Sequence, residues 1–185
     1  MPTKTSSSSY TKIRVQKRAK DDDWIRDFLG QTAFGIMATV RDGQPFLVTR
    51  NFAYDQSAHA IYMHGAKKGR TYENIQVNDN ISFSVSEMGR LLPNEQAMEV
   101  SVEYAGVVVF GRVSLVEELE EARHGLQLLL DKYFPGMHPS DDSISDDDVK
   151  ATAVFRIDIE SWSGKEHKAE DDFPGAFFYD ELVES

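Results

Sequence analysis

The sequence predicts a mainly β protein, a β-barrel of six antiparallel strands with helices around it. Five short segments rich in β-branched and aromatic residues follow one another, several of them at the spacing of hairpins. A sixth, from Glu99 to Val116, is long for one strand and contains Gly106 and Gly111, which suggest bulges or a sharp bend where a sheet curls. Together these features favour a barrel over alternating β-α-β units.

The chain begins its predicted structure with a short helix at residues 21–31. Aspartates stand at its N-terminal end, where the helix dipole favours negative charge. A strand at residues 34–40 follows, and Asp42 and Gly43 supply the turn chemistry of a hairpin whose return strand is residues 46–54. The apolar face of the helix consists of Trp24, Ile25, Phe28 and Leu29.

Residues 58–64 form the third expected strand. Strand alternation puts Tyr62 and His64 on one face of it and the neighbouring apolar side chains on the other. A short helix is expected at residues 69–78, and the fourth strand at residues 80–86. The fifth strand is the long segment described above.

The clearest helix is predicted at residues 117–134, with glutamates in its first turns and Pro135 as its stop. The acidic stretch 138–150 lacks the ligand spacing of a calcium loop and is expected to be a solvated loop. The last strand is residues 151–162, by its alternation. The face of the long helix comprises Leu119, Ala122, Leu126, Leu129 and Tyr133.

Length and composition are those of one soluble domain of 185 residues with a net charge of −11. The absence of cysteine excludes disulfides and thiolate metal sites, and histidine spacing predicts no metal site. No apolar run approaches the roughly 20 residues that a membrane span needs. The start of the chain lacks the apolar centre of a secretory signal. We therefore expect a cytoplasmic protein with no membrane partner.

We expect the chain to consist of three parts. Residues 1–14 form a flexible basic arm, residues 15–166 the barrel domain, and residues 167–185 a tail whose four aromatic side chains pack on the barrel or on a partner. The first twenty residues carry six basic and no acidic side chains. A nucleic-acid role for this arm is an alternative, but the acidic body would repel phosphate backbones, so we expect no nucleic-acid partner.

One short stretch gathers positive charge on this acidic chain: residues 61–75, IYMHGAKKGRTYENI. A glycine-containing turn that runs into a helix offers unpaired N–H groups to an anion. Arg70 can donate two hydrogen bonds, and Lys67 or Lys68 adds charge. The pattern favours a phosphate site beside His64, although an exposed turn and a structural histidine are the alternatives.

Four segments in order resemble the pyridoxamine-phosphate-oxidase-like flavoproteins, and most closely the nitroimidazole-resistance branch. They are DGQPFLVTRNFAYD, IYMHGAKKGRTYENI, VVVFGRVSLVEE and VFRIDIESWSGKE. The resemblance runs from about Val15 to Glu166. It implies a Greek-key split β-barrel that binds FMN, built as a homodimer with the cofactor at the subunit interface.

The resemblance also implies the site residues. His64 matches a histidine that lies near the flavin and substrate, and is the implied catalytic residue. Relatives usually have lysine where this chain has Thr71, proline where it has Thr49, and serine or glutamine where it has Gly106. The implied cofactor-binding residues are Val48, Thr49, Arg50, Asn51, Met63, His64, Gly65, Lys67, Lys68, Gly69, Arg70, Thr71, Trp162 and Lys165.

The implied function is that of an FMN-dependent oxidoreductase that reduces a small organic substrate, as a nitroreductase does. The alternative is a non-enzymatic module that holds flavin, haem or a related ligand in the same barrel. True pyridoxamine-phosphate oxidases end with an arginine-containing segment that grips the substrate, whereas this chain ends FFYDELVES. Vitamin synthesis is therefore not expected.

Overall fold

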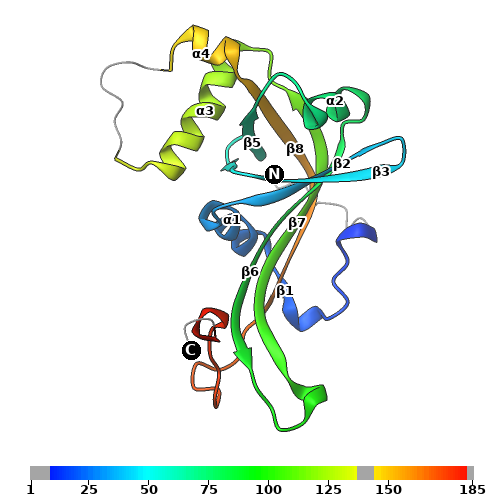
Figure 1. Cartoon of the computed structure of the whole chain (residues 1–185), viewed down its shortest axis with the longest axis vertical. Helices are drawn as coiled ribbons and strands as arrows, with labels where there is room; N and C mark the ends of the chain where they lie inside the picture. Colours follow the sequence, from blue (N-terminus) through cyan, green and yellow to red (C-terminus); the bar gives the residue numbers. More distant parts are fainter. Residues whose placement is uncertain (1–8, 137–143, 183–185) are drawn as a thin grey trace.

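The computed structural model describes residues 9–136 and 144–182. Its strands form one antiparallel sheet in the order β3-β2-β6-β7-β8-β5-β4, with β1 added beside β8 (Figure 1). The strands are β1 (Ala19–Lys20), β2 (Gly35–Arg41), β3 (Gln44–Arg50), β4 (Ala53–Asp55), β5 (Ala60–Gly65), β6 (Asn80–Leu92), β7 (Ser101–Leu115) and β8 (Ala153–His167). The helices are α1 (Asp22–Gln31), α2 (Arg70–Val77), α3 (Leu119–Tyr133) and α4 (Asp146–Ala151).

The predicted class, mainly β with flanking helices, is confirmed, but the prediction of six strands is wrong. The described residues form eight strands, and the two end strands, β3 and β4, do not pair with each other. The predicted strand at residues 46–54 combines most of β3 with part of β4. The break between them has a physical cause, because the N–H of Phe52 donates to the hydroxyl of Tyr133 (3.0 Å) rather than to a neighbouring strand. β1 and β4 are too short for alternation to be read.

Two local predictions about the sheet can be compared with the pairing. Asp42 and Gly43 have φ values of 54° and 76°, and Arg41 pairs with Gln44, so the two-residue hairpin turn is confirmed. The bulge predicted at Gly111 is also confirmed, since the pairing of β7 with β8 shifts there. No register shift occurs at Gly106, so the strand pairing shows no bulge at that glycine.

The acidic stretch predicted as a loop contains α4. Ser145 caps this short helix, its side chain accepting from the N–H of Asp148 while the Asp148 carboxylate bonds back to Ser145. Three aspartates therefore sit in the first turn, where the helix dipole favours them. Residues 137–143 of the predicted loop lie outside the described residues. No group of acidic or histidine side chains in the described ranges has the arrangement of a metal site.

The core has two parts. The larger lies inside the curled sheet and includes Phe83, Phe155 and Met37, with Phe28 and Leu29 of α1 packed against them. The smaller joins α3 to β5 and β8 and is built from Ala60, Tyr62, Ala122, Val149 and Val154. Within the described ranges, no helix combines the length and the apolar character needed to span a bilayer.

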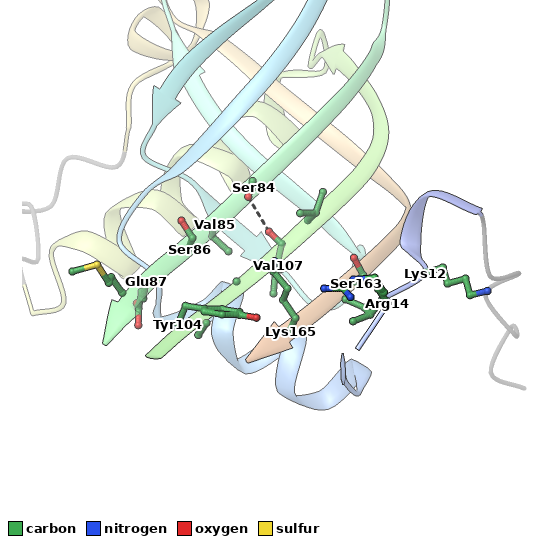
Figure 2. Close-up of a pocket in the computed structure, with 15 residues that line it drawn as sticks. Lys12, Arg14, Ser84, Val85, Ser86, Glu87, Tyr104, Val107, Ser163 and Lys165 are labelled. Carbon is green, nitrogen blue, oxygen red and sulfur yellow. Dashed lines mark hydrogen bonds between the residues drawn. The ribbon is translucent and has the colours of Figure 1, made fainter. Parts of the chain in front are cut away.

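Both ends of the described chain lie against the long strands. We call residues 9–20 the N-terminal segment. Tyr10 lies with its ring centroid 5.7 Å from that of Phe110, and β1 pairs with the end of β8. Figure 2 shows Lys12 and Arg14 on this segment. At the other end, Phe177 forms a bridge with Leu91 of β6, so the aromatic tail lies on the β6–β7 hairpin.

Candidate functional site

A cavity of about 440 Å³ lies between the strand ends and α3, and we call it the His64 cavity. His64 at the end of β5 and Asn51 after β3 supply polar groups on one side. The opposite side is apolar and comes largely from α3. The lining residues are Asn51, His64, Leu126, Leu129, Leu130, Tyr133, Phe134, Ile144 and Thr152.

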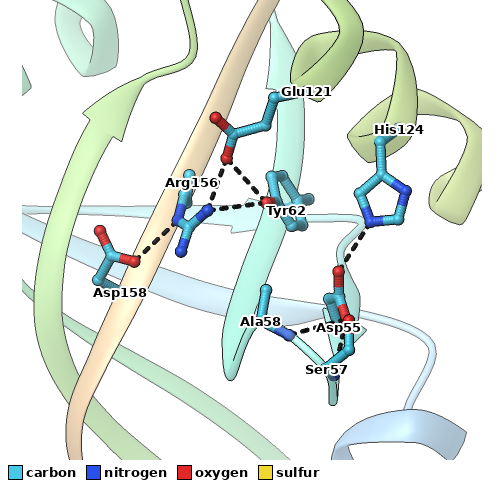
Figure 3. Close-up of polar contacts among 8 residues, drawn as sticks. All are labelled: Asp55, Ser57, Ala58, Tyr62, Glu121, His124, Arg156 and Asp158. Carbon is cyan, nitrogen blue, oxygen red and sulfur yellow. Dashed lines mark hydrogen bonds and ion pairs between the residues drawn. The ribbon is translucent and has the colours of Figure 1, made fainter. Parts of the chain in front are cut away.

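Hydrogen bonds and one ion pair fix α3 in place over β5 (Figure 3). The hydroxyl of Tyr62 donates to Glu121 Oε1 (2.9 Å), and Arg156 Nη1 reaches the same oxygen (2.6 Å). Farther along the helix, His124 Nε2 lies 2.7 Å from Asp55 Oδ2. Since α3 forms the apolar wall, these contacts determine the shape of the His64 cavity.

The polar chemistry of the cavity depends on His64. Tyr62 and His64 share the face of β5 that looks toward α3, as alternation predicts, because Tyr62 belongs to the core between β5 and α3 while Met63 belongs to the other core. Burial of the imidazole, together with the positive charge of Arg50, lowers the pKa of His64 below its ordinary 6.5. The ring is therefore mainly neutral at pH 7, and the neutral form has one N–H donor and one lone pair.

Arg50 is held beneath the end of β5. Its Nη1 donates to the carbonyl of His64 (3.4 Å), and its guanidinium lies 5.8 Å from the centroid of the Phe155 ring. A Cβ at Gly65 would lie 3.1 Å from Arg50 Nη1, so glycine gives this side chain its room. Among the described residues, the buried Nε of Arg50 has no hydrogen-bond partner. Burial lowers the pKa of Arg50.

The turn that was predicted to bind a phosphate lies between β5 and α2. α2 begins at Arg70 after Gly69, whose φ of 92° suits glycine, and no side chain caps the first turn. Lys68 and Arg70 are exposed, and the Arg70 guanidinium lies 4.8 Å from the centroid of the Phe46 ring. Lys67 points elsewhere and donates to the carbonyl of Lys150 in α4.

The other residues predicted to bind the cofactor differ in how far their side chains are exposed. Thr49 and Asn51 are exposed, whereas Val48 packs against the core and Thr71 is buried. The side chain of Met63 is fully buried in the core. It is therefore a packing group and does not face the His64 cavity.

Trp162 and Lys165 lie away from the His64 cavity in this chain. The indole of Trp162 is buried, and its Nε1 donates to Asp22 Oδ1 (2.8 Å). Lys165 lines a different cavity of about 650 Å³ that also contains Gly106. Of the predicted residues, Asn51 and His64 therefore line the cavity and Arg50 contacts the carbonyl of His64, whereas Trp162 and Lys165 of β8 lie elsewhere.

The apolar wall of α3 was not predicted as part of a site. The sequence LQLLLDKYF has apolar residues at more positions than one buried helix face requires. The cavity wall contains Leu126, Leu129 and Tyr133 of the predicted face. Leu130 and Phe134, which lie beside that face, are the additional apolar positions that could have indicated a cavity.

The residues present fit a flavin phosphate and its attached chain. The uncapped start of α2 offers backbone N–H groups beside Arg70 and Lys68. Nothing lies within 4 Å of the Cβ position at Gly69, so an anion can approach the turn. The unpartnered Nε of Arg50 can donate to an acceptor that none of the described residues supplies.

Solved structures show the same fold at low identity. The flavocytochrome Anf3 from Azotobacter vinelandii is 22% identical with a TM-score of 0.76, covering 93% of this chain and 86% of its own. An FAD and heme binding protein from Mycobacterium smegmatis is 20% identical with a TM-score of 0.75, covering 91% and 79%. A candidate 5-nitroimidazole antibiotic resistance protein from Bacteroides thetaiotaomicron is 23% identical with a TM-score of 0.67, covering 80% and 84%.

No curated protein matches the chain in sequence. The family model described as pyridoxamine 5′-phosphate oxidase matches residues 21–166, which include β2 to β8, the His64 cavity and the turn before α2. The chain therefore belongs to the pyridoxamine 5′-phosphate oxidase family.

Proposed function

We propose that the chain binds FMN and serves as an FMN-dependent oxidoreductase of a small organic substrate. The observation that carries the proposal is the position of the uncapped start of α2. It follows the strand that bears His64 by only a few residues, so donors for a phosphate and an imidazole for a substrate stand on one continuous segment. Family membership supports a flavin as the bound group.

Different residues of the chain would contact different parts of the flavin. Arg70, Lys68 and the backbone N–H groups of the first turn of α2 bind the phosphate. Arg50 would supply a buried N–H donor to the ribityl chain or the ring of the flavin. When bound, the flavin supplies the transfer of electrons to or from the substrate.

His64 suits an uncharged and largely apolar substrate. Its neutral ring offers one hydrogen bond at the polar edge of a cavity whose other walls are mainly leucine and aromatic side chains. A charged substrate would lose its hydration there without gaining an opposite charge. The reduction of a flat, weakly polar ring compound fits this cavity best, and a nitro compound is one such substrate.

We also propose that two subunits complete the site. Trp162 and Lys165 do not reach the His64 cavity in one chain, and a second copy could bring Lys165 to the flavin. Apolar side chains on the β6–β7 hairpin and the tail offer area for such an interface, and light scattering would measure the mass. The exposed examples are Met88, Met98, Val100, Phe178 and Tyr179.

The flavin proposal is tested by titrating the purified protein with FMN and riboflavin and following flavin fluorescence. Riboflavin lacks the phosphate and is the matched control ligand. Arg70→Ala should weaken FMN at least tenfold while leaving riboflavin within twofold, because only the phosphate meets the guanidinium. An equal affinity for FMN and riboflavin in the wild-type protein would refute a phosphate site at α2.

A specific observation favours one alternative, a non-enzymatic haem-binding module. A neutral histidine at the edge of an apolar cavity is a suitable ligand for haem iron. Two proteins of the same fold are a flavocytochrome and an FAD and heme binding protein. Hemin titration distinguishes the alternatives. A Soret band that appears in the wild type and is lost in His64→Ala supports haem, and its absence in the wild type excludes this alternative.

A further inference from the structure

The chain between β3 and β4 contributes Asn51 to the His64 cavity but lies outside both strands. Arg50 is the last residue of β3 and pairs with Gly35 of β2, while β4 begins at Ala53 and pairs with β5 at the end of the sheet. Asn51 and Phe52 lie between the two strands, and we call them the β3–β4 junction. The position of this junction decides where the Asn51 amide lies in the cavity.

The hydroxyl of Tyr133, at the end of α3, holds the backbone of the junction in place of a neighbouring strand. It accepts from the N–H of Phe52 (3.0 Å) and lies 3.1 Å from the carbonyl oxygen of the same residue. It also reaches the carbonyl of Ala33, in the link between α1 and β2. The hydroxyl has one proton to donate to either carbonyl, and it accepts from Phe52 in both cases. Because an unpaired N–H in the protein interior is costly, these bonds favour one position of the junction.

The residue before Tyr133 holds the side chain of the same junction. The ammonium of Lys132 lies 3.8 Å from the centroid of the Phe52 ring, and it donates to the carbonyl of Leu29 (3.2 Å) in the last turn of α1. A cation over an aromatic face is attracted by the electrons of the ring. Phe52 is fully buried, and its ring centroid is 5.0 Å from that of Phe83. The end of α3 therefore fixes both the backbone and the ring of Phe52.

Tyr133 itself lines the His64 cavity. Its hydroxyl is engaged by the backbone of Phe52 and Ala33, so the part of the side chain left for a ligand is the ring. The ring extends the apolar wall of α3. The hydroxyl acts on the protein side of that wall, where it joins α3 to the segment that bears Asn51.

We infer that Tyr133 is a positioning residue of the His64 cavity, whose hydroxyl fixes the β3–β4 junction so that the Asn51 amide stays on the polar side of the cavity with His64. Arg50 joins the same segment to the end of β5, since its Nη1 donates to the carbonyl of His64 (3.4 Å). We take the molecule that Asn51 contacts to be the flavin, a step that rests on the proposed function. The contacts of Tyr133 do not depend on that step.

Titrations of Tyr133→Phe, Asn51→Ala and the double variant with riboflavin and FMN test the effect on binding. Tyr133→Phe keeps the ring and removes the hydroxyl, so both flavins should bind about five- to tenfold more weakly. If the hydroxyl acts through Asn51, its removal from Asn51→Ala should change the affinity less than about twofold. The matched control is Tyr54→Phe, which removes a hydroxyl that bonds with His59 Nδ1 (3.2 Å) outside the cavity lining and should change little. No loss in Tyr133→Phe, or the same loss with and without Asn51, overturns the inference.

Amide NMR spectra of the ligand-free protein separate this inference from the proposed function. In the wild type, the N–H of Phe52 should be protected from exchange although it lies outside any strand, and Tyr133→Phe should speed that exchange about tenfold or more. The side-chain amide signals of Asn51, identified with Asn51→Ala, should shift in Tyr133→Phe and stay in place in Tyr54→Phe. A Phe52 N–H that exchanges freely in the wild type, or Asn51 signals that do not move in Tyr133→Phe, overturns the inference whether or not flavin binds. If these signals change but the wild type binds no flavin, the proposed function fails and the positioning of Asn51 by Tyr133 stands.

Discussion

Asp55 should stabilise the fold in a way that depends on pH. The carboxylate is buried and lies beneath α3, where it accepts hydrogen bonds from Ser57 N (2.8 Å), Ser57 Oγ (2.6 Å) and Ala58 N (3.1 Å), with His124 Nε2 2.7 Å away. Burial favours the neutral acid, but the hydrogen bonds from Ser57, His124 and Ala58 outweigh it and lower the pKa to about 2 from 3.8.

A lowered pKa in the folded state means that stability is present above the unfolded pKa and is lost as the pH falls through the folded value. The shift from 3.8 to about 2 corresponds to about 2.5 kcal/mol at pH 7, and to about 1.3 kcal/mol at pH 3. Asp55→Asn keeps the size of the side chain and one acceptor oxygen but removes the charge. We therefore expect it to lower the free energy of unfolding by about 2 kcal/mol at pH 7 and by about half of that at pH 3.

Urea unfolding of the wild type and Asp55→Asn at both pH values measures the difference, and comparison with the wild type cancels the titration of the other carboxylates. The exposed Asp172→Asn is the matched control, and its effect should stay below about 0.5 kcal/mol at both pH values. A difference for Asp55→Asn that is the same at pH 7 and pH 3 would show that hydrogen-bond geometry, not charge, is responsible.

Three glycine-to-alanine substitutions should destabilise the fold in a graded way, measured by the same urea unfolding at pH 7. Gly111→Ala places its Cβ 2.1 Å from the carbonyl oxygen of Asp158, a backbone atom, so we expect a loss of about 3 kcal/mol or more. Gly125→Ala places its Cβ 2.7 Å from Tyr62 Cδ1, a side-chain atom rather than a backbone atom, so we expect about 1–3 kcal/mol. Gly43→Ala meets nothing within 4 Å but has a positive φ, so we expect about 1 kcal/mol, and a loss as large as that of Gly111→Ala would contradict the steric argument.

The sheet was predictable wherever the sequence pattern extended far enough. β2 and β3 follow from alternation around the Asp42-Gly43 turn, and the long β7 follows from its β-branched residues. β4 was not separable from β3, because the interruption depends on Tyr133, which is distant in sequence. α4 was hidden in an acidic run, where composition indicates solvent exposure and the capping box at Ser145 is a weaker signal.

Some parts of the candidate site could also be predicted from the sequence, and others could not. The turn at Gly69 and Arg70 could be identified because glycine, basic residues and a helix start are adjacent in sequence. The buried environment of Arg50 could not, since it depends on Gly65 and Phe155 lying beside it in the folded protein.

The environment of His64 limits the chemistry proposed for it. Partial burial and the neighbouring guanidinium of Arg50 both oppose a second proton on the ring, so the pKa of His64 is lowered and the neutral imidazole is the main form at neutral pH. What it offers is a hydrogen bond, or a lone pair, at the polar edge of an apolar cavity. The same features fit orientation of an uncharged substrate and ligation of haem iron, and they disfavour strong acid catalysis. Under the proposed function, the imidazole would position the substrate in the cavity, and the flavin would supply the reactivity.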